Sequence, residues 1–123
     1  MRVLVCGGRF CDPVQVMAWL SDNLHSTIRD WFGNDVGVSA IIHGDAKGAD
    51  KASGRWALEQ GIPVYAFPAD WQKHGRAAGP IRNLQMLAEG QPDLVVAFPG
   101  GRGTGDMVAR AMAAGIPVLE VEP

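Results

Sequence analysis

The chain has 123 residues and a mass of 13.1 kDa, which suits a single domain (residues 1–123) with its own hydrophobic core. Hydrophobic residues make up 47% of the sequence and charged residues 20%, a balance that excludes a disordered chain. The formal net charge of -2 lacks the basic excess of proteins that bind nucleic acid through its phosphates, so a nucleic-acid partner is disfavoured.

Membrane, metal and disulfide classes are also disfavoured. No hydrophobic run approaches the roughly 18 residues needed to cross a bilayer, and no signal-peptide pattern is present. Cys6 and Cys11 are the only cysteines, and no further Cys or His pair completes a metal site with them. We therefore expect a cytoplasmic protein with two reduced thiols, no membrane partner, no metal and no cofactor.

A strand and a long helix are predicted at the start of the chain. Residues 2–6 form an apolar run that ends at two glycines, which indicates a buried parallel strand. Asp12 before Pro13 is typical of a helix start, and Gly33 ends the helical segment at residue 32. The stripe expected to face the sheet consists of Val16, Leu20, Leu24, Ile28 and Trp31.

Strands and helices then alternate to the end of the chain. We predict strands at 38–42, 62–67, 94–98 and 116–121, and helices at 49–60, at 80–89 and from the 99–105 loop to about 114. Residues 70–79 have no clear period and predict a loop or an irregular turn. The stripe of the 80–89 helix is expected on Ile81, Leu84, Met86 and Leu87. This alternation predicts an α/β fold, a Rossmann-like three-layer sandwich with a central parallel sheet.

Three glycine-bearing loops follow predicted strands, where open parallel sheets carry their ligands. These loops are Gly7-Gly8-Arg9, Gly44 to Gly48, and Pro99-Gly100-Gly101-Arg102-Gly103-Thr104-Gly105. Glycine lets the backbone come close to a phosphate, and the N–H groups of the following helix point at the anion. The third loop is the strongest signal because it lies between an apolar strand and a helix, although its glycines could instead serve tight packing.

Four side chains near these loops each have two interpretations. Arg82 can hold a phosphate or carboxylate, or simply face solvent. Arg9 either reaches the ligand or pairs with Asp12. Asp50 lies in a first helical turn, where a carboxylate meets the ligand or only complements the helix dipole. Trp71 either stacks on a base or covers the core.

The combined motifs resemble the small YspA-like members of the SLOG superfamily, which also includes the LOG phosphoribohydrolases and the DNA-processing protein DprA. The resemblance covers nearly the whole chain. It is carried by Gly8-Arg9, Gly44-x-x-x-Gly48-Ala49-Asp50, Asp70-Trp71, Ala78-Gly79-x-x-Arg82-Asn83-x-x-Met86 and Phe98-Pro99-Gly100-Gly101-x-Gly103-Thr104. It implies a Rossmann-like fold, a nucleotide ligand held by its phosphate, and a homodimer or higher homo-oligomer.

In the LOG enzymes an arginine and a glutamate act at the ribose while the N-glycosidic bond is cleaved. By the resemblance Arg82 matches that arginine, but Met107 occupies the glutamate position. A thioether cannot replace a carboxylate near an oxocarbenium-like centre. The carboxylates that could substitute for it are Asp106, Asp70 and Asp50.

We therefore expect a domain that binds a nucleotide or a nucleotide-derived, ADP-ribose-like ligand as a sensor or sequestering protein. The alternative is an N-glycosidase that cleaves a nucleoside monophosphate, with Arg82, Asp106 and Asp70 as candidate catalytic residues; single-stranded DNA binding is a third alternative. The expected ligand-binding residues are Gly8, Arg9, Gly44, Gly48, Asp50, Trp71, Gly79, Arg82, Asn83, Pro99, Gly100, Gly101, Gly103 and Thr104.

Overall fold

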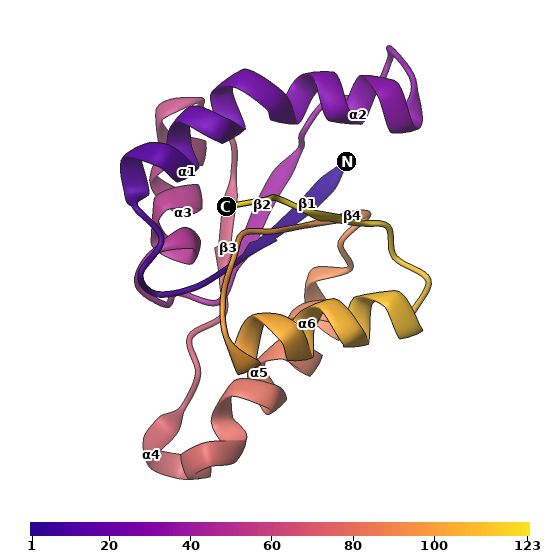
Figure 1. Cartoon of the computed structure of the whole chain (residues 1–123). Coiled ribbons are helices and arrows are strands. Elements are labelled where there is room, and N and C mark those ends of the chain that lie inside the picture. The colour runs from indigo at the N-terminus through magenta and orange to yellow at the C-terminus, as the bar shows by residue number, and fades with distance from the viewer.

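A computed structural model describes residues 1–123 and contains one five-stranded, all-parallel sheet (Figure 1). The strands are β1 (Arg2–Cys6), β2 (Ala40–His43), β3 (Val64–Ala66), β4 (Leu94–Ala97) and β5 (Val118–Glu120). Their order is β3-β2-β1-β4-β5, and Val3 at the centre pairs with Ile41 on one side and Leu94 on the other. The chain winds outward in opposite directions from β1, so the switch point of the sheet lies between β1 and β4.

Helices cover both faces of this sheet, which confirms the predicted three-layer architecture (Figure 1). One face is covered by α1 (Pro13–Trp19), α2 (His25–Phe32) and α3 (Ala49–Glu59), with a π-helical turn at Leu20–Leu24 joining α1 to α2. The other face is covered by α5 (Ala78–Gln85), its π-helical extension at Met86–Gly90, and α6 (Arg102–Ala113).

The two faces bury cores of different size. Alternation along β1 directs Val3 and Val5 to one side and Leu4 and Cys6 to the other. The core under α1, α2 and α3 contains 14 buried residues, including Trp56, whereas the core under α5 and α6 contains eight.

Two predicted apolar stripes are wrong in part. Trp31 is 47% exposed, because the end of α2 extends past the packed core. There the neighbouring Phe32 contacts the core, whereas Trp31 does not. Ile81 and Leu84 are also exposed, at 42% and 56%. The buried side of α5 consists instead of Ala78, Gly79 and Asn83. A hydrophobic pattern overlooks a helix face built from small and polar residues.

The irregular loop predicted for residues 70–79 is also wrong in part. Asp70 caps a short helix, α4 (Trp71–His74), and its Oδ1 accepts a hydrogen bond of 3.0 Å from the Lys73 N–H. A 3₁₀ turn at Gly75–Ala77 then leads directly into α5. A four-residue helix is too short to show a period in the sequence.

Both thiols are free, as predicted: Cys6 is buried in β1, and Cys11 is half-buried in the loop that follows. The longest helices of the structure lack the length and apolar content that a membrane span requires.

Candidate functional site

The loops after β1, β2 and β4 meet at the carboxyl edge of the sheet, and Gly8 joins them. The Gly8 N–H donates to the Pro99 carbonyl at 2.8 Å, and the Gly8 carbonyl accepts from the Ala49 N–H at 3.3 Å. A Cβ at Gly48 would strike the Gly8 carbonyl, and a Cβ at Gly100 would lie 2.7 Å from the Gly8 nitrogen. We call Gly8, Gly48 and Gly100 the loop junction; these glycines serve tight packing.

The first turn of α6 lies beside this junction and is open. A Cβ at Gly101 or Gly103 would meet no atom within 4 Å. No side chain caps the helix, and no protein acceptor takes the N–H groups of Arg102, Gly103 and Thr104. Three backbone donors at the positive end of a helix dipole favour a bound anion.

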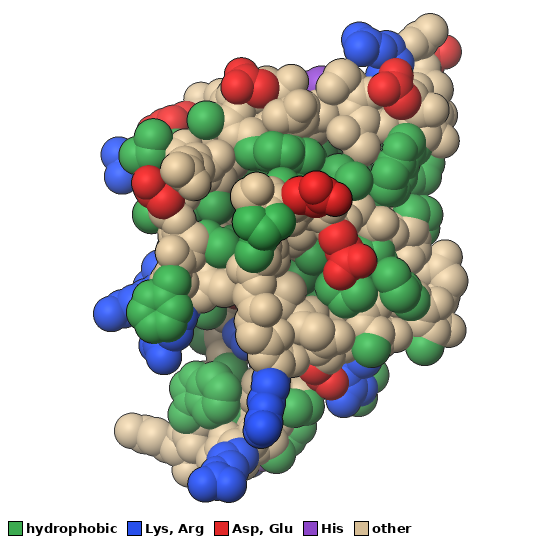
Figure 2. All heavy atoms as spheres, viewed as in Figure 1, with side chains coloured by type: hydrophobic (Ala, Val, Ile, Leu, Met, Phe, Trp, Pro, Cys, Tyr) green, Lys and Arg blue, Asp and Glu red, His purple; other side chains and the backbone are tan.

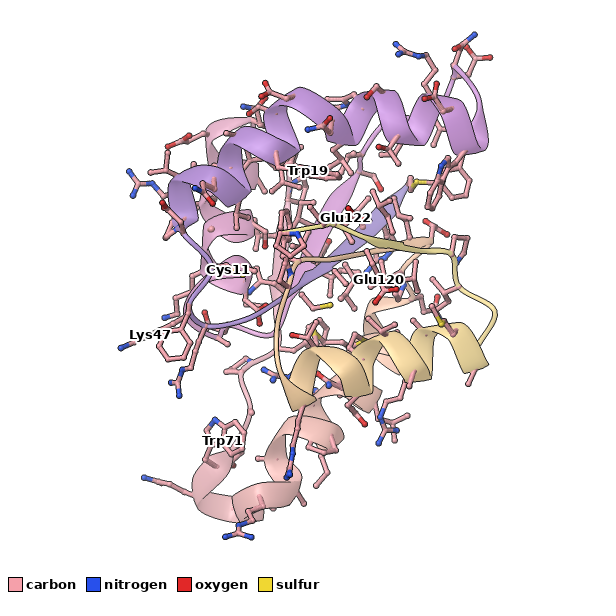
Figure 3. The ribbon with its side chains drawn as sticks, viewed as in Figure 1. Cys11, Trp19, Lys47, Trp71, Glu120 and Glu122 are labelled. Atoms are coloured by element: carbon pink, nitrogen blue, oxygen red, sulfur yellow. The ribbon has the colours of Figure 1, made fainter.

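A cavity of about 1010 Å³ opens in front of this turn; we call it the basic cavity. Its charged lining consists of Arg9, Lys47, Lys51, Arg76, Arg82 and Arg102, with Asp45, Asp50 and Asp106. Figure 2 shows Lys and Arg side chains gathered at the lower left of the molecule, and Figure 3 places Lys47 and Trp71 on that side. The excess of cations favours an anionic ligand.

Arg82 is held in place at the wall of the basic cavity. From α5, its Nη1 donates to the Gly44 carbonyl and its Nε donates to the Asn83 side-chain oxygen at 3.0 Å. A Cβ at Gly44 would strike the guanidinium, so glycine is needed there for the contact. The guanidinium retains further N–H donors for an anion in the cavity.

Asn83 connects α5 to the start of α6. It is 3% exposed, and its amide nitrogen donates to the Gly103 carbonyl at 3.1 Å and to Asp106 Oδ2 at 3.0 Å. Arg110 Nε donates to the same Asp106 oxygen at 2.9 Å. The Asn83 oxygen accepts from Arg82, and the Asn83 nitrogen donates to α6. These hydrogen bonds fix the position of the first turn of α6.

Asp50 is buried, yet one of its oxygens reaches the basic cavity. The residue is 5% exposed, and its Oδ2 accepts from the N–H groups of Gly44 at 3.2 Å and Ala46 at 3.3 Å. Its Oδ1 accepts no hydrogen bond from the protein. Because the protein has no fully buried side-chain oxygen without a partner, and because Asp50 lines the cavity, Oδ1 is accessible from the cavity. Burial raises the pKa of Asp50 to about 6, against the opposing effects of the Ala46 N–H and the charge of Arg82.

Two interpretations from the sequence are wrong. Trp71 does not cover the core: it is 59% exposed, it lines the basic cavity, and its ring lies against Gly79. Arg9 forms no ion pair with Asp12, whose Oδ1 instead caps α1 by accepting from the Val14 N–H at 2.9 Å.

Three buried residues lie beneath or beside the basic cavity and support its walls. Met107 is fully buried in the smaller core, and burial raises the pKa of the Cys6 thiol to about 12. Burial also lowers the pKa of His43, whose Nδ1 accepts the Asp45 N–H at 2.9 Å. All three side chains are therefore uncharged near neutral pH, and their role at the site is to pack beneath it and beside its β2 loop.

The structure brings most of the predicted residues together. Ten of the 14 expected ligand-binding residues line the basic cavity: Gly8, Arg9, Asp50, Trp71, Gly79, Arg82, Asn83, Gly101, Gly103 and Thr104. Of the other four, Gly44 lies against the Arg82 guanidinium and Gly48 lies against Gly8 and Arg9. Pro99 and Gly100 line a second cavity beyond Gly8. Of the two candidate catalytic aspartates, Asp106 lines the basic cavity, whereas Asp70 does not and caps α4.

Four cations of the lining were not predicted from the sequence: Lys47, Lys51, Arg76 and Arg102. An exposed lysine or arginine has no sequence pattern around it that distinguishes a site residue from an ordinary surface residue. Only their positions relative to the predicted glycine loops could have indicated them, since Lys47 and Arg102 lie inside those loops.

The sheet order and the glycine loops at its switch point define a Rossmann-like α/β domain of the doubly wound class. Comparison with known proteins shows a match to the YspA, cpYpsA-related SLOG family over residues 1–74, and the chain belongs to this family. It is similar to the Gene 61 protein of Mycobacterium phage D29, with 39% identity over 126 residues that cover 96% of this chain and 94% of that protein. Membership of the SLOG family indicates a nucleotide-related function.

Proposed function

We propose that the protein binds a nucleotide or nucleotide-derived ligand in the basic cavity, with a phosphate at the first turn of α6. The observation that carries this proposal is the uncapped helix end with its open glycines, Gly101 and Gly103, inside a cavity that six cationic side chains line. A phosphate there would accept backbone N–H donors and lie in a positive field.

The surrounding side chains fit the remaining parts of a nucleotide. Arg82 is already oriented by Gly44 and Asn83, so it loses little freedom when it binds an anion. Trp71 offers an exposed ring on which a base can stack, and the free oxygen of Asp50 can accept a ribose hydroxyl. Binding alone needs no further group, which favours a sensor or sequestering role.

The proposal is tested by calorimetric titration with AMP and with adenosine at low salt. AMP should bind and adenosine should bind at least tenfold more weakly, since only AMP carries the phosphate. Arg82→Ala should weaken AMP binding by roughly 10- to 100-fold, the usual effect of losing a charged hydrogen bond. Arg55→Ala on the exposed side of α3 serves as the matched control. Equal affinity for AMP and adenosine would contradict the assignment of a phosphate site.

A second candidate function, cleavage of a nucleotide N-glycosidic bond, is favoured by Asp50. A carboxyl group with a pKa of about 6 beside the cavity can change protonation state near neutral pH and can stabilise positive charge on a ribose. Met107, at the position of the LOG glutamate, lies in the core, so a glutamate introduced there would be buried. The test therefore depends on Asp50.

For a hydrolase, chromatography would detect adenine released from AMP, and Asp50→Asn would abolish the release while AMP still binds. We expect no release, because Met107 stands in place of the glutamate of the LOG motif. Release by the unmodified protein that survives in Asp50→Asn but not in Asp106→Asn would assign the carboxylate role to Asp106.

A further inference from the structure

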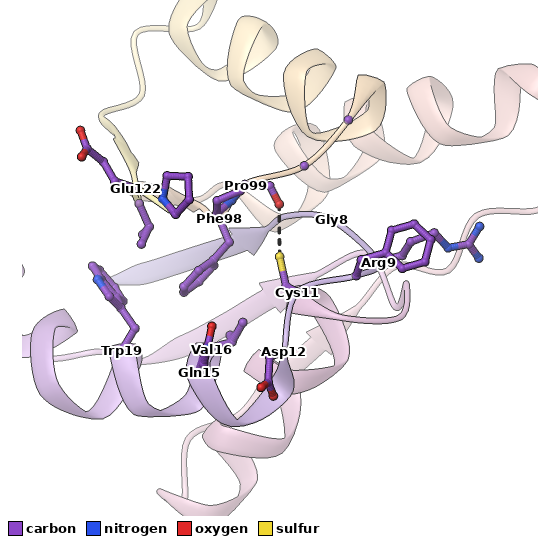
Figure 4. Close-up of a pocket in the computed structure, with 15 residues that line it drawn as sticks. Gly8, Arg9, Cys11, Asp12, Gln15, Val16, Trp19, Phe98, Pro99 and Glu122 are labelled. Atoms are coloured by element: carbon purple, nitrogen blue, oxygen red, sulfur yellow. Dashed lines mark hydrogen bonds between the residues drawn. The ribbon is translucent and has the colours of Figure 1, made fainter.

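A second cavity, of about 820 Å³, lies on the other side of Gly8. It shares Gly8, Arg9 and Gly101 with the basic cavity, and we call these three residues the glycine ridge. The two cavities are therefore neighbours across the switch point between β1 and β4. We call the second one the aromatic cavity because Trp19 and Phe98 form its wall (Figure 4).

The wall of the aromatic cavity suits a flat ring. The Trp19 and Phe98 rings meet edge to face, with centroids 5.5 Å apart and an interplanar angle of 85°. Val16 and Phe98 are buried, and Cys11 Sγ is directed to the Pro99 carbonyl at 3.1 Å (Figure 4). Val16 and Phe98 therefore back the cavity, and the half-buried Trp19 ring is the aromatic surface that a planar ligand ring can cover.

The charges of the aromatic cavity are opposite to those of the basic cavity. Its carboxylates are Asp12 and Glu122, and its one cationic residue, Arg9, points away from Trp19 and Phe98 (Figure 4). Gln15 also lines it, with a side-chain amide that has no protein partner. A phosphate is disfavoured here, whereas a neutral or cationic ring with amide or amino groups is favoured.

We infer that one two-part ligand occupies both cavities: its phosphates lie at the glycine ridge, its first nucleoside lies in the basic cavity, and a second, neutral or cationic aromatic ring lies in the aromatic cavity. This inference rests on the proposed function, because it places the phosphates at the start of α6. It is supported by the continuity of the cavities at the ridge and by their complementary charges. Doubly wound sheets bind dinucleotides across the crevice where the strand order reverses.

Three probes separate the parts of such a ligand. AMP carries one base and one phosphate, ADP-ribose adds the pyrophosphate and a second ribose, and NAD⁺ adds a cationic carboxamide ring. Affinity measured by calorimetry should rise from ADP-ribose to NAD⁺ by about tenfold, the effect of one base stacked on an aromatic side chain. Trp19→Ala should remove this gain and leave AMP affinity within about twofold of the unmodified protein.

Gln15→Ala provides a second variant, because this exposed side chain has no packing role whose loss could unfold the protein. It should lower NAD⁺ affinity by about threefold and leave ADP-ribose affinity unchanged. Trp31→Ala, on the far end of α2, is the matched control for loss of a tryptophan. Thermal melting of each variant shows whether it is folded.

The outcomes distinguish the two proposals. Failure of all three probes to bind would overturn the proposed function itself. Binding of AMP with equal affinities for ADP-ribose and NAD⁺ would leave the proposed function and overturn the two-part ligand. A gain for NAD⁺ that persists in both folded Trp19→Ala and Gln15→Ala would also overturn it, because the ring would then lie elsewhere.

Discussion

The carboxyl edge of the sheet contains two groups of glycines with opposite environments. At the loop junction, Gly48 and Gly100 have no room for a methyl group, because three loops touch there. At the first turn of α6, Gly101 and Gly103 face open space. The first group lets the protein close on itself, and the second keeps a surface free for something outside the chain. Changes in the two groups should therefore affect different properties: stability in one case and ligand affinity in the other.

The largest effect is expected at the loop junction. Gly48 has a φ of +82°, and a Cβ there would strike the Gly8 carbonyl and approach Arg9 to 2.8 Å. Gly48→Ala should lower the free energy of unfolding by about 3 kcal/mol or more, since backbone strain and a backbone clash add. Gly61→Ala is the matched control: its φ is +72°, but no atom lies within 4 Å, so it should cost only about 1 kcal/mol. Equal losses in urea denaturation would show that the loops separate easily.

The next effect concerns the buried carboxylate between the two regions. Because the folded pKa of Asp50 is raised from 3.8 to about 6, the folded state prefers the protonated form. The ionised carboxylate therefore costs stability, and this cost grows as the pH rises from about 4 to 6 and is constant above. Asn keeps an acceptor for the Gly44 and Ala46 N–H groups, so Asp50→Asn should be more stable than the unmodified protein by about 2–3 kcal/mol at pH 7.

Below pH 4 the stabilities of Asp50→Asn and the unmodified protein should agree. Urea midpoints of both proteins at pH 4, 5 and 7 provide the measurement. His43 contributes equally to both, so it cancels in the difference; its lowered pKa means that its own contribution is lost as the pH falls below about 6.5. A stability difference that does not change with pH would mean that the carboxylate is not desolvated.

A smaller effect is expected where α5 holds the open turn in place. Asn83→Ala removes the hydrogen bonds to the Gly103 carbonyl and to Asp106, together with the acceptor of the Arg82 Nε–H, and should cost about 2 kcal/mol of stability. It should also weaken AMP binding, because the first turn of α6 and the Arg82 guanidinium both lose a supporting hydrogen bond. Asn23→Ala removes a single hydrogen bond to Trp19 within its own helical segment and should have neither effect beyond about 1 kcal/mol. Unchanged AMP affinity in folded Asn83→Ala would show that the turn holds its position alone.

The smallest effect on stability separates the two properties most clearly. Gly103 and Gly105 both lie in α6 with open space around them, but only Gly103 lines the basic cavity. Alanine has the higher helix propensity, so each substitution should stabilise the protein by roughly 0.5–1 kcal/mol. Only Gly103→Ala should lower AMP affinity, by about tenfold, because its methyl group occupies ligand space. Equal affinity losses in Gly103→Ala and Gly105→Ala would contradict a phosphate at this turn.

The sequence by itself determined the α/β alternation, the parallel sheet and the glycine loops at the strand ends, because these depend on local hydrophobic period and on residues adjacent in the chain. It also indicated eleven of the residues that line the basic cavity, ten as ligand-binding residues and Asp106 as a catalytic candidate. It could not distinguish Gly100 from Gly101, since the difference depends on contacts with Gly8, more than 90 residues away in the chain.

The tertiary structure decided the features that depend on such distant contacts. It buried Asp50 beside loop N–H groups and placed the Met107 side chain in the core. It also left Ile81 exposed while Asn83 turned inward to hold α6. No sequence motif indicated the aromatic wall, because it joins Trp19 of α1 with Phe98, the residue that follows β4. Such a surface exists only when the sheet places these two segments side by side.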